Sequence, residues 1–495
     1  MAPPGSAAGL SRRQWRPSPS HAGDRPYRRA GHGRTLVTER AVGRSDHARS
    51  RQGEALSRAD AAWLHMEQPT NHFVVTSLAL LDERLELDRL REALRRKLPM
   101  LPRLAQRVVE PGWPLAPPRW EDDPQFRLEA HLHRVALPGA GGRRELEELI
   151  ADLIGQPLDL QRPPWQAYLV EDYEGGSAVL TRLHHCVGDG AALVQMQRAL
   201  ADTRRDGWLS VPRSEVLAPS TDAGPDLATR AVSALRGVAG VAGDPGRVLG
   251  ALRTMAAGAG TLARLSLLDP DPPTPLRAPP GVLKRAAWSE PIPLSTVRRI
   301  AHGAGATVND ALVSMVAGGL GAYLAEHGAP SRRVRAMVPR LNRFPGAIGP
   351  IRGRRSMVLL DLPVGVRHAR ERLMRVKIEM DRIKASLEAQ VGWVVVAGLG
   401  LLPAGLERPA ADFFGDKATL VLTNVVGPRR RLYLAGSPIR TQTFWEPESG
   451  SLSLGVSIFS YAGQVVLGVV SDERSVSRPA ELVGAFERAF ADLAS

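Results

Sequence analysis

Two adjacent histidines, His184 and His185, lie in the stretch of the chain whose residue types best suit chemistry, 183–190 (LHHCVGDG). An apolar run precedes this stretch and an apolar helical pattern follows it, which predicts a strand, a turn and a helix. Because side chains alternate along a strand, one imidazole can face a cavity while the other packs into the protein. The glycines on both sides of Asp189 are typical of a tight turn or of a close approach by a substrate. We therefore expect only one of the two histidines to do chemistry.

The spacing His-His-x-x-x-Asp-Gly resembles the motif of acyltransferases related to chloramphenicol acetyltransferase and of the condensation domains of peptide synthetases. Residues 56–67 (LSRADAAWLHME) are more specific. They resemble the Leu-Ser-x-x-Asp-Ala-x-Phe-Leu-x-x-Glu opening of the bacterial wax ester synthase/acyl-CoA:diacylglycerol acyltransferase family, with Trp63 in the aromatic place. The resemblance runs from Leu56 to the C-terminus.

Acyl transfer from a thioester to an alcohol needs a base, a donor for the oxyanion and a pocket that excludes water. A neutral histidine suits the first task, since its unperturbed pKa is about 6.5. The family resemblance implies that His185 is this base and that the alcohol attacks directly, without an acyl-enzyme. It implies a supporting role for His184, a structural role for Asp189 through an arginine pair, and close approach of backbone and substrate at Gly190.

Two further blocks resemble the same family. The first is Pro163-Pro164-Trp165, where the family has Pro-Leu-Trp, and we expect Trp165 to be a core anchor. The second is Thr-Val-Asn-Asp at 307–310, in which Thr307 is a good helix N-cap. Asn309 and Asp310 need polar partners if they are buried. They either cap the helix or line the acyl or alcohol channel.

The net charge of +14 is unevenly distributed, since residues 1–54 carry half of it. This Arg- and Pro-rich tail shows no secretory signal, and its composition predicts disorder. Arginine far outnumbers lysine, which is typical of a GC-rich genome. The other half of the charge can serve phosphate-bearing ligands or an anionic membrane surface, although a solvated basic surface is favoured for any single arginine. No nucleic acid is expected as a partner. The single cysteine, Cys186, excludes an internal disulfide, and we expect it to pack as a small apolar side chain.

No metal site is predicted. His131 and His133 share a face of an expected strand, 126–135, but no third ligand stands at a suitable spacing, which favours surface polarity. No cofactor is expected besides acyl-CoA as substrate, and the residues that bind it are not assigned. The Gly-x-Ser-x-Gly elbow, the Walker loop and His-Glu-x-x-His are absent from the sequence.

The predicted fold class is α/β (α+β), with two chloramphenicol-acetyltransferase-like subdomains of mixed sheets flanked by helices. The first, 55–205, carries the histidine motif, and the second is 284–495. A long crossover with an amphipathic pattern, 206–283, joins them, and the active site is expected in a tunnel between them. The expected helices are 56–67, 85–98, 143–154, 294–302, 307–324, 366–390 and 478–493. Further expected strands are 72–81, 288–293, 334–339, 355–362, 419–428, 452–459 and 464–470.

From these features and the family resemblance we expect an O-acyltransferase that moves a long-chain acyl group from acyl-CoA to diacylglycerol or a fatty alcohol. One alternative is a condensation-type enzyme with another acceptor or a carrier-protein donor. Another is a non-catalytic lipid-surface protein. The apolar segment 391–406 is shorter than the roughly 20 residues that span a bilayer. We therefore expect a cytoplasmic protein attached peripherally to the inner face of the membrane or to lipid inclusions.

Overall fold

The computed structural model describes residues 53–495, except 111, 113–116, 189, 210–259, 262, 343–353, 387, 389–390, 393–406 and 449. The predicted tail lies outside the described residues except for its last two positions, of which Glu54 begins strand β1 (Glu54–Ala55). Most of the predicted crossover, most of the apolar segment 391–406 and Asp189 also lie outside them.

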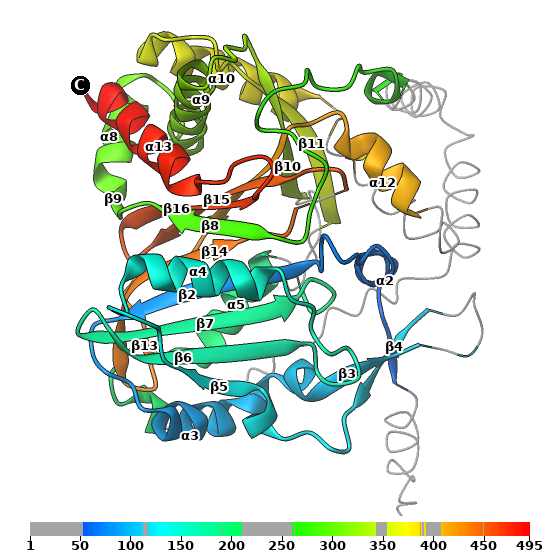
Figure 1. The fold of residues 1–495 in the computed structure, drawn as a ribbon, viewed down its shortest axis with the longest axis vertical. Helices are drawn as coiled ribbons and strands as arrows, with labels where there is room; N and C mark the ends of the chain where they lie inside the picture. Colours follow the sequence, from blue (N-terminus) through cyan, green and yellow to red (C-terminus); the bar gives the residue numbers. More distant parts are fainter. Residues whose placement is uncertain are drawn as a thin grey trace, which may run out of the picture. The chain divides into compact units, whose positions relative to one another are not determined.

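One mixed sheet has the strand order β13-β14-β2-β7-β6-β5 (Figure 1). Its strands are β13 (Tyr433–Leu434), β14 (Ser437–Trp445), β2 (Val74–Leu81), β7 (Gly176–His184), β6 (Trp165–Tyr173) and β5 (Leu132–Val135). The pairs are antiparallel except β5 with β6, which is parallel. Strand β7 ends at His184, which pairs with Val74 at the start of β2.

The other large sheet has the order β11-β10-β12-β15-β16-β8, with β9 paired to β16. Its strands are β11 (Arg354–Leu362), β10 (Val334–Asn342), β12 (Leu420–Val426), β15 (Leu454–Tyr461), β16 (Gln464–Asp472), β8 (Lys284–Trp288) and β9 (Ile292–Pro293). The pairs β10–β12 and β12–β15 are parallel, which makes this sheet mixed as well. The predicted fold class is confirmed.

The strand β14 crosses the boundary that the sequence predicts between the two subdomains. Its residues fall in the predicted range 284–495, yet it pairs with β2 in the first sheet, with Trp445 opposite Thr76. Because β2 is buried on both faces, an unpaired edge along it would expose apolar side chains and free backbone groups. The range 284–495 therefore does not form a self-contained unit.

Helices cover the sheets on several sides. They are α2 (Arg58–His65), α3 (Leu87–Lys97), α4 (Arg143–Ile154), α5 (Gly190–Leu200), α8 (Leu294–Gly303), α9 (Val308–Glu326), α10 (Ala369–Ala385), α12 (Glu407–Gly415) and α13 (Pro479–Ala494). Leu146 and Ile150 of α4 share one apolar cluster with Leu180 of the first sheet and Trp288 of the second. Helix α4 therefore packs between the two sheets, as Figure 1 shows.

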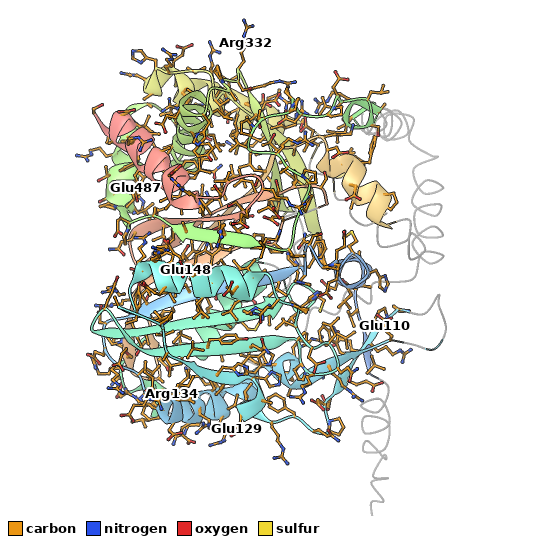
Figure 2. All side chains as sticks on the ribbon, viewed as in Figure 1. Glu110, Glu129, Arg134, Glu148, Arg332 and Glu487 are labelled. Carbon is orange, nitrogen blue, oxygen red and sulfur yellow. The ribbon has the colours of Figure 1, made fainter. Side chains whose placement is uncertain are left out.

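Helix α9 is the described helix that is long and apolar enough to cross a membrane. Two-thirds (67%) of the window that passes this test is buried inside the protein. Its side chains form one cluster with those of α8, α10, α13 and the second sheet. The position of α9 in this core accounts for its apolar character. Charged side chains elsewhere, such as Glu129, Arg134 and Glu148, project from the surface (Figure 2).

Candidate active site

His185 occupies the turn that follows β7, and three neighbours fix its imidazole. Its backbone N–H donates to the carbonyl oxygen of Phe73 at 2.8 Å. Its ring packs against Trp63 of α2, with 4.8 Å between ring centroids. Its Nε2 lies 3.2 Å from Oε1 of Glu446. The side chain is only 8% exposed, so little water competes for these contacts.

Phe73 helps to shape this arrangement through its backbone. Its φ of 48° lies in the left-handed region, which is costly for a bulky residue. The amide oxygen of Asn71 accepts a hydrogen bond from the Phe73 N–H at 3.1 Å and so supports that conformation. The Phe73 ring packs toward Trp63 while its carbonyl oxygen faces His185. Strained backbone of this kind is commonly found at functional sites.

His184 points away from His185 and is fully buried. Its Nδ1 accepts a hydrogen bond from the N–H of Cys186 at 3.2 Å, which places the ring hydrogen on Nε2. That Nε2 lies 3.9 Å from Oε2 of Glu67. Burial, with smaller effects from His185 and His72, lowers the pKa of His184 to about 3. The ring is therefore neutral near pH 7 and holds the turn that presents His185.

The other residues of the motif have different surroundings. Cys186 is buried in an apolar cluster with Leu56, Leu64 and Trp120, and burial raises the pKa of its thiol. This environment agrees with the prediction that Cys186 packs and does not act as a nucleophile. Helix α5 begins at Gly190. The predicted arginine pair of Asp189 stays a prediction, because Asp189 lies outside the described residues.

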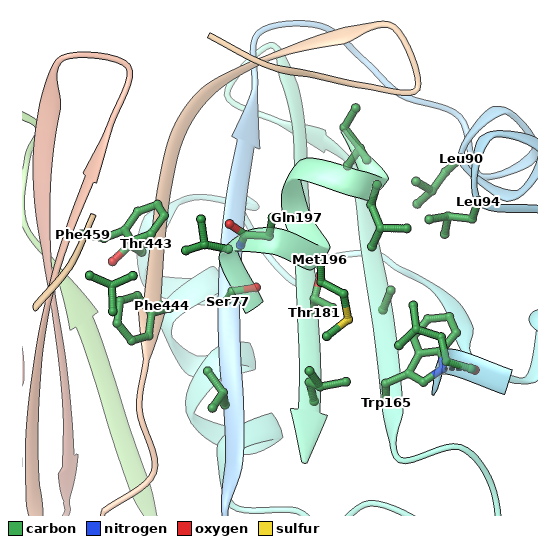
Figure 3. Close-up of a pocket in the computed structure, with 18 of the residues that line it drawn as sticks. Ser77, Leu90, Leu94, Trp165, Thr181, Met196, Gln197, Thr443, Phe444 and Phe459 are labelled. Carbon is green, nitrogen blue, oxygen red and sulfur yellow. Dashed lines mark hydrogen bonds between the residues drawn. The ribbon is translucent and has the colours of Figure 1, made fainter. Parts of the chain in front are cut away.

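An apolar pocket lies against β2 and β7 of the first sheet (Figure 3). Leu183 and Thr181 of β7 line it, and His185 follows Leu183 by two residues, in the turn that ends the strand. The remaining walls come from several elements. They are Val75, Ser77, Leu90, Leu94, Leu98, Leu104, Trp165, Ala167, Val194, Met196, Gln197, Leu200, Val425, Leu434, Thr443, Phe444 and Phe459.

Trp165 forms part of this wall and also anchors the core. It is 4% exposed, and its Nε1 donates to the carbonyl oxygen of Leu104 at 2.7 Å. His131 stacks on it, with 4.7 Å between ring centroids, and is itself only 3% exposed. The expected surface position of His131 is therefore wrong. Residues 128–130 form a 3₁₀ turn in place of a strand, which turns His131 inward onto the indole.

The Asn309–Asp310 pair stands at the start of α9. Asp310 closes a capping box, since its Oδ2 accepts from the Thr307 N–H at 2.8 Å while Thr307 Oγ1 accepts from the Asp310 N–H. Asn309 Oδ1 accepts from Nδ2 of Asn424 at 2.6 Å and joins α9 to the end of β12. Neither residue lines the apolar pocket. This geometry favours the capping alternative over the channel alternative.

Sequence reasoning missed Glu446, although the structure brings it to His185. The only signal in the sequence is an acidic residue directly after two aromatic residues, Phe444 and Trp445, and this pattern has many explanations unrelated to catalysis. No group of three His, Cys, Asp or Glu side chains suited to a metal occurs in the described part of the chain.

Comparisons with known proteins agree with this architecture. Residues 56–312 match the model of the wax ester synthase/diacylglycerol acyltransferase catalytic domain. Residues 354–494 match that of the WS/DGAT C-terminal domain. A probable diacylglycerol O-acyltransferase of Mycobacterium tuberculosis is 28% identical over 455 residues, which cover 88% of this chain and 95% of that protein.

Two solved structures show the same fold. The wax ester synthase/diacylglycerol acyltransferase from Marinobacter aquaeolei VT8 has a TM-score of 0.64 at 22% identity, covering 89% of this chain and 98% of that one. The first condensation domain of the calcium-dependent antibiotic synthetase has a TM-score of 0.56 at 17% identity, covering 90% of this chain and 96% of that one. Together with the matched domains, which span more than half of the sequence, they lead to one assignment. The chain is a member of the wax ester synthase/diacylglycerol acyltransferase family.

Proposed function

We propose that the protein transfers a long-chain fatty acyl group from acyl-CoA to an alcohol, either diacylglycerol, giving triacylglycerol, or a fatty alcohol, giving a wax ester. The observation that carries the proposal is the apolar pocket whose wall includes Leu183, two residues before His185 in the chain. The pocket is apolar with a few polar side chains in its walls, as is common in small-molecule sites. Membership of the family supports the reaction class.

His185 is the general base of the proposed reaction. Its imidazole takes the proton of the acceptor hydroxyl while the hydroxyl oxygen bonds to the thioester carbonyl carbon. The resulting tetrahedral intermediate loses its C–S bond, and the leaving CoA sulfur takes the proton back from the imidazolium. The products are the ester and free CoA, and no acyl-enzyme forms. His184 supports this cycle by holding the turn at Cys186.

The pocket suits a hydrocarbon chain because its walls are mostly aliphatic and aromatic. The polar side chains among them, Ser77, Thr181, Gln197 and Thr443, are few. Burying an acyl chain there removes about 0.8 kcal/mol of unfavourable hydration per methylene. It also excludes water, which would otherwise compete with the alcohol for the thioester.

Peripheral attachment to a membrane or lipid droplet is part of the proposal, because both proposed acceptors are lipids. Leu267 is 82% exposed, and Val282 and Leu283 are also exposed. A net charge of +14 would attract an anionic leaflet. We propose a cytoplasmic location at the inner face of the membrane or on lipid inclusions. The reaction needs acyl-CoA as substrate and no further cofactor, and no nucleic acid takes part.

The test is product analysis with purified protein, palmitoyl-CoA and either hexadecanol or dioleoylglycerol. We expect palmityl palmitate or triacylglycerol to form with one CoA released per ester. Absence of ester with both acceptors would overturn the storage-lipid assignment, and activity only with a carrier-protein thioester would favour a condensation-type enzyme. Flotation with vesicles that contain phosphatidylglycerol tests attachment, and failure to float would overturn it.

A further inference from the structure

Glu446 reaches His185 because of the order of three strands. The strands β14 and β7 flank β2 on either side, and both pairings are antiparallel. Phe444 of β14 lies opposite Ser77 and lines the apolar pocket. Glu446 directly follows Trp445, the last residue of β14, and its carboxylate reaches His185. Pro447 follows it and restricts Glu446 to an extended backbone, which holds the carboxylate in place.

The contact between the two side chains is a buried one. Glu446 is 9% exposed and His185 is 8% exposed, and the closest atoms are 3.2 Å apart. An electrostatic interaction is stronger in such an environment than at the surface. Trp63 packs on the imidazole and limits its rotation. The indole of Trp63 therefore restrains the face of the imidazole, and the carboxylate of Glu446 restrains its edge.

The hydrogen bond also determines which ring nitrogen stays available. An ionised carboxylate can only accept, so the imidazole Nε2 donates to Glu446. The lone pair of the neutral ring then resides on Nδ1, which has no hydrogen-bond partner among the described residues. The second carboxylate oxygen of Glu446, Oε2, is likewise buried with no partner in the described part of the chain. His185 Nδ1 and Glu446 Oε2 are therefore both buried hydrogen-bond acceptors without a partner among the described residues. A site that binds a hydroxyl group needs such an acceptor.

We propose that Glu446 is a positioning residue for His185: it fixes the rotamer and tautomer of the imidazole and stabilises the imidazolium that forms when the acceptor gives up its proton. This inference rests on the proposed acyl transfer. The step needs no further reactant, since the proton that His185 receives returns to the CoA sulfur. An aspartate or glutamate paired to a base histidine has this role in other enzymes.

Other titratable groups lie around the pair and must be considered in any pH profile. His184 is the neighbour of His185 in the chain. A small cavity of about 300 Å³ beside Glu446 is lined by His72, Lys284 and Glu448, among others. Lys284 is already paired with Glu448, at 2.5 Å, and lies 3.6 Å from Asp472. Among these groups, Glu446 is the carboxylate that forms a hydrogen bond with His185.

The test is Glu446→Gln, which keeps the shape of the side chain and removes its charge. We expect kcat for acceptor-dependent CoA release to fall about 10-fold or more, with little change in KM, because positioning acts on the transition state. We also expect the acidic limb of the kcat/KM profile to move to lower pH, because the imidazolium loses the anion beside it. Glu446→Asp keeps the charge, so its acidic limb stays in place while its rate is intermediate.

Two controls separate this role from a structural one. Glu174→Gln breaks another ion pair made to β14, that of Arg440 with Glu174 at 2.8 Å, which is partly exposed and lies at the end of β7 opposite His184. It should leave kcat and the pH profile unchanged. The double variant His185→Ala/Glu446→Gln should be no slower than His185→Ala, because Glu446 acts through His185.

The outcomes also separate this inference from the proposed function. If the wild type is active, His185→Ala is inactive, and Glu446→Gln keeps both the wild-type kcat and the wild-type acidic limb, the role of Glu446 is overturned alone. A slower Glu446→Gln with an unmoved acidic limb overturns it as well. Absence of acyl transfer by the wild type overturns the proposed function and this inference together.

Discussion

At the scale of single residues, the two adjacent histidines owe their different properties to their surroundings. His184 is enclosed on all sides, and its burial leaves it neutral with a pKa of about 3. His185 lies between an indole and a carboxylate. One imidazole is thus suited to hold a turn and the other to accept a proton.

The buried His184 should make the fold sensitive to acid. Its pKa is lowered on folding from about 6.5 to about 3, so the unfolded chain binds the additional proton between these values. Stability is therefore full above about pH 6.5 and is lost as pH falls toward about 3, by about 3 kcal/mol at pH 4.5. His184→Asn keeps an acceptor for the Cys186 N–H and cannot titrate. Urea unfolding of both proteins at pH 7.0, 5.5 and 4.5 measures the difference.

We expect the wild type to lose about 3 kcal/mol more than His184→Asn between pH 7.0 and 4.5. Other titrating groups are shared by both proteins, so they cancel in this comparison. Equal losses in the two proteins would contradict a neutral, buried His184.

Residue roles could be predicted only where the neighbours are close in sequence. Strand alternation is enough to separate His184 from His185, and a Thr followed by Asp three residues later is enough to predict a cap at Thr307. Glu446 is 261 residues from His185, and nothing local indicates that the two meet. That contact depends on the strand order, which the sequence pattern alone does not determine.

At the scale of elements, amphipathic periodicity predicted best where one face of an element is buried. Helix α4 matches its predicted bounds because Leu146, Ile150 and Leu153 recur on a buried face. The expected helix 366–390 is wrong at both ends, since α10 begins at Ala369 and ends at Ala385. Its charged sequence extends the helical pattern beyond the part that packs, as Arg372, Leu373 and Val376 are the buried residues of its first half.

The strand β6 offers a test of the apolar pocket at the scale of its walls. Ala167 lines the pocket and is small, so Ala167→Phe should shorten the space for an acyl chain. We expect the ratio of kcat/KM for palmitoyl-CoA to that for octanoyl-CoA to fall about 10-fold or more, within the 1–3 kcal/mol that chain-length contacts provide. Thiol release with each donor at one fixed acceptor concentration gives this ratio.

The matched control is Ala79→Phe, on strand β2 of the same sheet. Ala79 is partly buried against the same apolar cluster but does not line the pocket. It should lower stability without changing the ratio. An unchanged ratio in Ala167→Phe, in protein that remains folded, would mean that the acyl chain binds elsewhere.

At the scale of the whole molecule, the pairing of β14 with β2 makes the predicted subdomains 55–205 and 284–495 depend on each other. Without residues 437–445, the strand β2 loses its partner along one edge, and His185 loses Glu446. Helix α4 likewise supplies apolar side chains to the core that the two sheets share. The predicted boundaries near 205 and 284 therefore mark positions in the sequence, while the packing crosses them.

The consequence can be measured with two fragments that together omit residues 206–259. We expect the fragment 53–205 expressed alone to aggregate, because the exposed edge of β2 can pair with other chains. Co-expression with 260–495 should restore soluble protein that elutes as one complex in size-exclusion chromatography. A soluble, cooperatively unfolding fragment 53–205 would contradict this dependence.

The most direct measurement of the central claim is the release of free CoA thiol from palmitoyl-CoA by the wild type and by His185→Ala, with hexadecanol or dioleoylglycerol as acceptor. Circular dichroism of both proteins establishes that the variant is folded. The account predicts acceptor-dependent release by the wild type and its loss in the variant, by a factor of about 100 or more. Release that persists in folded His185→Ala at the wild-type rate would contradict His185 as the base.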